Sequence, residues 1–258
     1  MQYLLLPIRI LFTIYGLLLF VAFMFLILPL VIIASFFGKV KGGDFIYKLC
    51  RLWADVLLPL VGIFHKNIYA TPHDRNKQYV FVVNHISYID IPIILKTIRK
   101  QHFRILAKYE TSKIPIFGFI YKSAAIMVDR GSAKKRAESI IELKKVISKG
   151  ISIVIFPEGT FNETHQPLKE FYDGAFRIAI ETQTSIKPIL FLDSYDRLSY
   201  KSIFSLTPGK SRAMFLEEIN VNGLTVKDVR ILKDKVHTIM EEKLLLYKAG
   251  WINNIGNK

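Results

Sequence analysis

Two short polar segments carry residue types that could perform acid–base chemistry, and each follows an apolar run. In the first, residues 79–83 (Tyr-Val-Phe-Val-Val) lead to His85, and Asp90 follows five positions later. An Asp bonded to one imidazole nitrogen fixes the tautomer, so the other nitrogen can take a proton from a hydroxyl. A turn between the two residues, with Ser87 available as the cap of a following helix, would bring them together. On its own, this spacing fits a structural histidine beside a capping Asp better than a catalytic pair.

The second segment ends another apolar run. Residues 151–156 (Ile-Ser-Ile-Val-Ile-Phe) are followed by Pro157, Glu158, Gly159 and Thr160. Gly159 permits unusual backbone dihedrals, and such a turn can direct amide N–H groups at a developing oxyanion. The side chains of Glu158 and Thr160 could contact an acceptor. Taken alone, the segment fits an ordinary strand-to-loop turn equally well.

Together, the two segments resemble the signature motifs of the glycerolipid acyltransferase family, in particular the lysophosphatidic acid (1-acylglycerol-3-phosphate) acyltransferases. The resemblance rests on Asn84-His85-x4-Asp90 and Phe156-Pro-Glu-Gly-Thr160, and it covers roughly residues 66–192. It implies that His85 is the general base and that Asp90 orients it. It also implies that the Glu-Gly-Thr turn contacts the substrate.

Two further segments extend the resemblance. Residues 106–110 (Leu-Ala-Lys-Tyr-Glu) look like the family's segment with a phosphate-contacting lysine, which would be Lys108. Residues 125–130 (Ala-Ile-Met-Val-Asp-Arg) look like the block whose arginine binds the glycerol phosphate, which would be Arg130. Both residues are therefore expected to bind the acceptor.

One position departs from the family pattern. Family members commonly carry Arg after Glu-Gly-Thr, whereas this chain has Phe161. An arginine can pair with a phosphate through two hydrogen bonds, which Phe cannot do. Phosphate recognition must then rest on Lys108 and Arg130, helped by Lys169 or Arg177, or else the acceptor is not a phosphate monoester.

The N-terminus predicts a membrane segment. Residues 10–37 are 28 consecutive residues without a charge, which exceeds the roughly 20 that a helix needs to cross a bilayer. A cleaved signal peptide has a shorter apolar region and a small-residue cleavage site. Pro29 could kink this helix or divide it, and a hairpin that enters and returns also fits.

The charges beside this segment predict its orientation. Arg9 precedes it, and four basic residues follow it: Lys39, Lys41, Lys48 and Arg51. Positive charge favours the cytoplasmic side, so the rest of the chain is expected there, on the inner or cytoplasmic membrane. We therefore expect a membrane-anchoring helical segment over residues 1–64, which includes an amphipathic helix over residues 44–63, and an α/β acyltransferase domain over residues 65–258.

Downstream of residue 66, apolar strand patterns alternate with helical periodicity. The expected strands are Asn67–Ala70, Tyr79–Val83, Arg104–Ala107, Ala124–Val128, Ile151–Phe156, Ile186–Leu192 and Ala213–Glu217. The expected helices are Tyr88–Arg99, Ser132–Ser148, Gly174–Thr182 and Val226–Lys248, the last with Thr225 as N-cap and Asp228 three residues on. This alternation is typical of an α/β fold with a mostly parallel sheet flanked by helices.

Composition narrows the partners. The formal net charge is +15, which suits an anionic membrane or an acidic acyl carrier protein. No pattern of a nucleic-acid-binding module occurs. One cysteine, Cys50, excludes an intrachain disulfide, and we expect it to be an inert packing residue. The histidines lack metal-ligand spacing, and no nucleotide-binding or serine-nucleophile motif occurs, so neither a metal nor a cofactor is expected.

The sequence thus predicts transfer of a fatty-acyl group from an acyl-CoA or acyl carrier protein thioester to the hydroxyl of lysophosphatidic acid, giving phosphatidic acid. Two alternatives stay open. The acceptor could be a lyso-lipid without a phosphate, or the chain could be a non-catalytic membrane-binding module with the same fold.

Overall fold

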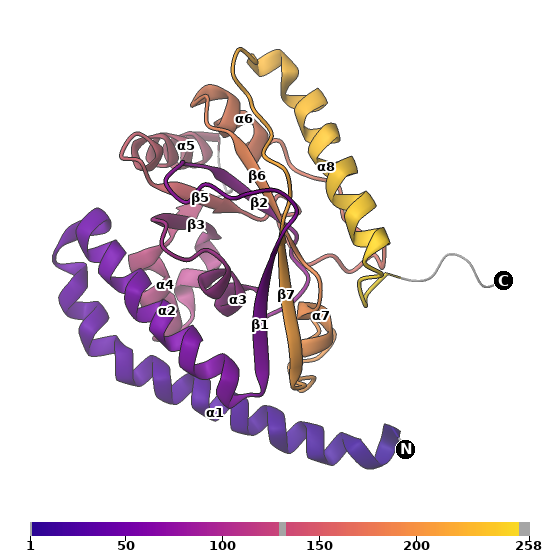
Figure 1. Ribbon diagram of the computed structural model, residues 1–258. Helices are drawn as coiled ribbons and strands as arrows, with labels where there is room; N and C mark the ends of the chain where they lie inside the picture. Colours follow the sequence, from indigo (N-terminus) through magenta and orange to yellow (C-terminus); the bar gives the residue numbers. More distant parts are fainter. Residues whose placement is uncertain (1, 129–132, 253–258) are drawn as a thin grey trace.

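A seven-stranded sheet lies at the centre of the computed structural model, which describes residues 2–128 and 133–252 (Figure 1). The strands are β1 (Ile63–Tyr69), β2 (Val80–Val83), β3 (Phe103–Lys108), β4 (Ile126–Val128), β5 (Ser152–Ile155), β6 (Ile186–Phe191) and β7 (Gly209–Phe215). Their order is β1-β7-β6-β2-β5-β3-β4, and all neighbours are parallel except β6 and β7. The expected mostly parallel sheet is confirmed, although β1 begins four residues earlier than the sequence predicted.

Strand β2 explains why this sheet is covered on both faces. All four of its residues are fully buried. Phe81 and Val83 belong to one hydrophobic cluster, whereas Val80 and Val82 belong to another. Successive side chains of a strand point to opposite faces, so an unbroken apolar run requires cover on each side.

Helices supply that cover. The helices are α1 (Gln2–Ser35), α2 (Gly43–Leu60), α3 (Asp90–Thr97), α4 (Phe117–Ala124), α5 (Ala133–Ile147), α6 (Gly174–Glu181), α7 (Ser194–Arg197) and α8 (Val229–Leu246). The first four lie on one side of the sheet, and α5, α6 and α8 lie on the other (Figure 1). The predicted capping box of Thr225 and Asp228 is present, just before α8.

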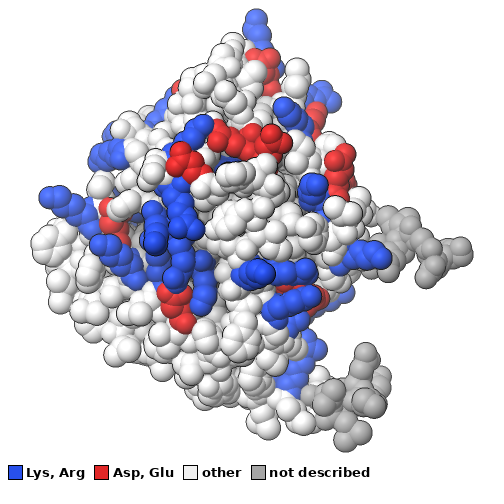
Figure 2. All heavy atoms as spheres, in the orientation of Figure 1, with Lys and Arg blue, Asp and Glu red and all other residues white. Residues whose placement is uncertain are grey.

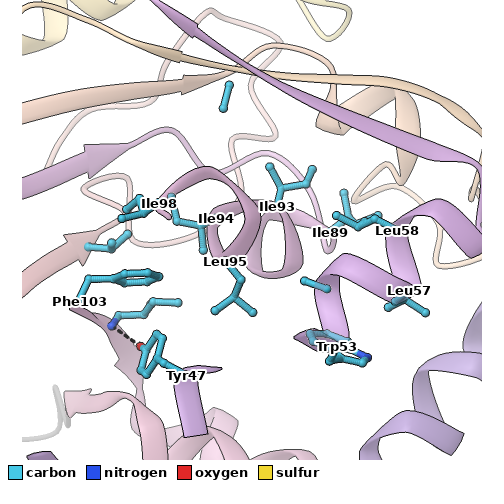
Figure 3. Packing of buried hydrophobic residues seen from close by; sticks show 14 of the residues in the cluster. Tyr47, Trp53, Leu57, Leu58, Ile89, Ile93, Ile94, Leu95, Ile98 and Phe103 are labelled. Carbon is cyan, nitrogen blue, oxygen red and sulfur yellow. Dashed lines mark hydrogen bonds between the residues drawn. The ribbon is translucent and has the colours of Figure 1, made fainter. Parts of the chain in front are cut away.

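The first cluster joins the N-terminal helices to the sheet. Trp53 and Leu57 of α2 and Ile93 of α3 point into it together with Phe103 of β3 (Figure 3). The hydroxyl of Tyr47 accepts a hydrogen bond from the Ile105 N–H of β3, at 2.8 Å. The helical segment and the sheet therefore share one core.

Helix α1 continues through Pro29 without a break. Its residues Leu6–Ser35 are long and apolar enough to cross a membrane, judged by length and composition. In the structure α1 lies along α2 at the side of the domain (Figure 1). One face packs inward through Met24, Ile27 and Val31, while the opposite face exposes large apolar side chains. Helix α1 runs along the bottom of the view in Figure 1. In the same orientation, Figure 2 shows few charges along that edge, whereas Lys and Arg gather above it.

Arg104 ties the connection between α1 and α2 to the sheet. Its guanidinium, 3% exposed, donates to the carbonyls of Lys39 at 3.0 Å and Val40 at 3.1 Å. The same group pairs with the Asp44 carboxylate at 2.8 Å. Arg104 is the second residue of β3, and Lys108 is the last. This contact therefore fixes where the pair of helices α1 and α2, the helical hairpin, meets the strand.

Replacing Arg104 with Met should loosen the hairpin, because two carbonyls lose their side-chain donor and Asp44 keeps only His102 as a side-chain partner among the described residues. We expect the free energy of unfolding to fall by about 3 kcal/mol, at the lower end for a buried ion pair that loses one partner. The matched control is Arg99→Met, since Arg99 pairs with Asp55 at the surface and such pairs contribute about 1 kcal/mol or less. Chemical unfolding in one detergent measures both, and equal losses would contradict the role given to Arg104.

Candidate active site

His85 and Asp90 form the pair that the sequence predicts. The distance from His85 Nδ1 to Asp90 Oδ2 is 2.8 Å. His85 follows the carboxyl end of β2, and Asp90 is the first residue of α3. The turn between them is closed by the Asp90 N–H, which donates to the Ser87 carbonyl at 3.2 Å. Five positions apart in sequence, the two side chains therefore meet.

The same carboxylate oxygen also organises the backbone of this turn. The N–H groups of Ile86 and Ser87 donate to Asp90 Oδ2 at 2.8 Å and 2.9 Å. Asp90 is fully buried, whereas the His85 side chain is 21% exposed. A buried carboxylate needs such donors to offset lost hydration. The expectation that Ser87 caps α3 is wrong: its hydroxyl donates to the Leu198 carbonyl, and the helix begins at Asp90.

Glu158 connects the β5 turn to the loop that carries His85. Its Oε1 accepts the His85 N–H at 2.8 Å, and its Oε2 accepts the Lys169 N–H at 2.9 Å. The residue is 1% exposed. Burial raises the pKa of Glu158 to about 8 and the Asp90 carboxylate adds to the rise, while the two N–H donors oppose it. Glu158 is thus committed to backbone groups and positions the loop.

Gly159 and Thr160 lie in the turn after β5, as the sequence predicts, but the Gly159 N–H does not point at an oxyanion. Gly159 has a φ of +71°, the left-handed region that favours glycine. Its N–H donates to the Phe156 carbonyl at 3.1 Å, so it serves the turn. The Thr160 side chain is exposed, and its Oγ1 accepts a hydrogen bond from Lys169 Nζ at 2.6 Å. Through this contact with Thr160, Lys169 reaches the site, and no sequence motif predicts the contact.

A cleft of about 550 Å³ joins these residues. His85, Lys108, Gly159 and Thr160 all line it, together with apolar side chains from β5 and α4 that include Ile155, Phe156, Phe117 and Tyr121. The carboxyl ends of β2, β3, β4 and β5 meet here, where open α/β sheets bind ligands. Arg130 lies outside the described residues, two positions after Val128, which lines the cleft.

Aromatic rings enclose the imidazole of His85. The ring centroids of Phe156 and Phe161 each lie 4.4 Å from that of His85. Tyr88 packs edge-on against Phe161 at 4.9 Å. The side chain at position 161 therefore contacts the imidazole and presents no charge to the cleft.

Other candidate groups in the described part of the chain stay apart from this site. No group of three or more His, Cys, Asp or Glu residues there could hold a metal ion. Burial raises the pKa of the Cys50 thiol to about 12, as suits a packing residue. Arg177 pairs with Glu181 at 2.9 Å on α6, so its charge is already compensated.

Comparisons with known proteins identify the family and the fold. A family model described as Acyltransferase matches residues 63–192. An uncharacterized acyltransferase of Schizosaccharomyces pombe is 29% identical over 66% of this chain, which spans 62% of that protein's length. A 1-acyl-sn-glycerol-3-phosphate acyltransferase of Haemophilus influenzae is 27% identical, covering 74% of this chain and 79% of its own length. The crystal structure of the 1-acyl-sn-glycerophosphate acyltransferase PlsC from Thermotoga maritima has the same fold, with a TM-score of 0.73 and 20% identity over 95% of this chain and 98% of its own.

Glu158 makes stability depend on pH in a defined direction. Between about pH 4.5 and about 8 the folded protein keeps a proton on Glu158 that the unfolded chain releases. The stabilisation that the protonated Glu158 gives the fold is therefore complete below this window and is lost as the pH rises through it. The free energy of unfolding falls by at most about 1.4 kcal/mol per pH unit. The excess stability of wild type over Glu158→Gln should shrink from pH 5 to pH 8 in chemical unfolding. An excess that stays constant across this range would contradict the raised pKa, and Glu163→Gln, an exposed carboxylate of the same cleft, is the control.

Proposed function

The chain belongs to the acyltransferase family, and on that basis we propose that it transfers a fatty-acyl group from an acyl thioester to the free hydroxyl of lysophosphatidic acid. The product is phosphatidic acid, and the donor is a thioester of CoA or acyl carrier protein. The observation that carries the proposal is the 2.8 Å bond between His85 and the buried Asp90, in the wall of a cleft with a lysine. Relatives named for this reaction support the choice of acceptor.

His85 acts as the general base. The Asp90 carboxylate accepts a hydrogen bond from the Nδ1–H, which keeps the proton on Nδ1 and leaves Nε2 able to take the proton of the acceptor hydroxyl. The acceptor oxygen attacks the thioester carbonyl, and collapse of the tetrahedral intermediate breaks the C–S bond. The departing thiolate takes the proton from the imidazolium, so no acyl-enzyme forms. Such proton transfer contributes about 10²- to 10⁴-fold, and alignment of the two substrates supplies much of the rest.

Binding groups around the cleft have separate roles. Lys108 contacts the acceptor phosphate, together with Arg130. Because the Gly159 N–H is used inside the turn, the Thr160 N–H is the backbone donor for the oxyanion. The apolar side of the cleft, with Phe117 and Ile155, takes the start of an acyl chain.

Helices α1 and α2 hold the enzyme at its substrates. Both the acceptor and the acyl product are lipids, and the outer face of α1 exposes apolar side chains such as Leu18, Leu26 and Ile33. Burying such a face in the bilayer is favourable. The basic residues after α1 favour the cytoplasmic side of the inner or cytoplasmic membrane. Membrane lipids and the acyl donor are then the partners.

Replacing His85 with Ala should lower acyl transfer by about 10²- to 10⁴-fold, because no other group takes the hydroxyl proton. Membrane association and fold should stay unchanged, since His85 lies in the cleft wall. Phosphatidic acid formation, measured by mass spectrometry, tests this, with the exposed His102→Ala as the control. Near wild-type turnover in His85→Ala would contradict the general-base role.

A second acceptor class has one observation in its favour. Phe161 and Tyr88 present uncharged rings beside His85, which also suits a lyso-lipid whose head group lacks a phosphate.

Supplying the wild-type enzyme with an equal mixture of lysophosphatidic acid and a lyso-lipid with an amino-acid head group separates the two acceptors. We expect phosphatidic acid to dominate the products, because Lys108 lines the cleft. Mass spectrometry of the mixture with both donor types gives the answer. Dominant acylation of the amino-acid lyso-lipid would replace the proposed acceptor.

A further inference from the structure

The described residues that line the cleft carry little positive charge for a phosphate. Among its described lining residues, Lys108 and Glu163 carry opposite charges, and the remaining side chains are neutral or belong to His85. A phosphate monoester carries close to two negative charges at neutral pH. Its binding therefore calls for positive charge besides Lys108, and Arg130, to which the proposed function also gives the phosphate, lies outside the described residues.

Lys169 lies at the rim with its ammonium group at the cleft wall. Its Nζ donates to Thr160 Oγ1 at 2.6 Å, and Thr160 is an exposed lining residue. The bond from the Lys169 N–H to the buried Glu158 carboxylate, at 2.9 Å, anchors the backbone. The same carboxylate holds the His85 N–H, so one side chain fixes the lysine relative to the imidazole.

The ammonium group of Lys169 has no ion-pair partner among the described residues, and Glu158 acts on it electrostatically without forming an ion pair. No carboxylate in residues 2–128 or 133–252 forms an ion pair with it, whereas Arg177 pairs with Glu181 and Lys233 pairs with Asp173. Its side-chain partner is the neutral hydroxyl of Thr160, which donates to the Phe161 carbonyl at 3.4 Å. A bond of that length is weak, so a phosphate oxygen can replace the carbonyl as the acceptor. An ammonium and a hydroxyl held together in this way can bind one phosphate oxygen each.

We propose that Lys169, together with the Thr160 hydroxyl, binds the phosphate of the acceptor and so determines the preference for a phosphate-bearing lyso-lipid. This assignment rests on the proposed function and adds a residue to its acceptor site. It adds to Lys108, the last residue of β3, a cation at Thr160 in the turn after β5. The side chain of Phe161 cannot donate a hydrogen bond to the phosphate, and Lys169 supplies that donor instead.

Lys169→Met, Lys169→Arg and the control Lys227→Met, an exposed lysine before α8, test the assignment in the full-length enzyme. The acceptors are lysophosphatidic acid and a monoacylglycerol with the same acyl chain. For Lys169→Met we expect the KM for lysophosphatidic acid to rise about 10- to 100-fold, as for the loss of a charged hydrogen bond. The KM for the thioester and the rate with monoacylglycerol should stay within about twofold, and Lys169→Arg should restore much of the binding.

Each outcome has one meaning. Wild type that acylates lysophosphatidic acid, with an unchanged acceptor KM in Lys169→Met, overturns the assignment and leaves the proposed function standing. A fall in kcat with both KM values unchanged also overturns it, because that result indicates a role at the oxyanion. Wild type that fails to acylate lysophosphatidic acid but acylates monoacylglycerol overturns the proposed acceptor before any variant is measured. Thermal unfolding of each variant excludes loss of fold as the cause.

Discussion

A single buried carboxylate oxygen, Oδ2 of Asp90, receives the imidazole of His85 and two backbone N–H groups of the turn before α3. Without those three donors a carboxylate with no exposed surface would be costly to bury. The turn, the start of the helix and the orientation of the imidazole are therefore fixed by one set of hydrogen bonds. The rest of the site is arranged around an imidazole that can take up only one position.

A second carboxylate carries that order across the sheet. Because β2 and β5 are parallel neighbours, their carboxyl ends lie side by side, and Glu158 after β5 can reach the His85 N–H after β2. The two acids have different tasks. Asp90 contacts the imidazole side chain, whereas Glu158 contacts only backbone groups and, with its raised pKa, keeps little charge beside the first. Of the two carboxyl groups near this histidine, only that of Asp90 bonds the imidazole.

Sequence periodicity predicted the sheet well, because its strands are short apolar runs that end at polar residues. It also located His85, Asp90, Glu158, Gly159 and Thr160, all of which follow strands whose carboxyl ends meet. Helices α4 and α7 were not expected. Helix α7 has four residues, too few for a helical period. The contact of Lys169 with Thr160 could not be predicted either, since it depends on how a loop of irregular structure folds back after the turn. The sequence also could not show that the Gly159 N–H donates to the Phe156 carbonyl within the turn.

The central claim is that Asp90 sets the tautomer of His85, and nitrogen-15 NMR of the histidine ring tests it most directly. In enzyme labelled at histidine and held in detergent near neutral pH, His85 should show a protonated Nδ1 with a strongly hydrogen-bonded proton and an unprotonated Nε2. His85→Gln assigns the resonances, because the signals that it removes belong to this ring. A ring that is protonated at Nε2 and unprotonated at Nδ1 would contradict the account, since Nε2 could then take no proton from the acceptor hydroxyl.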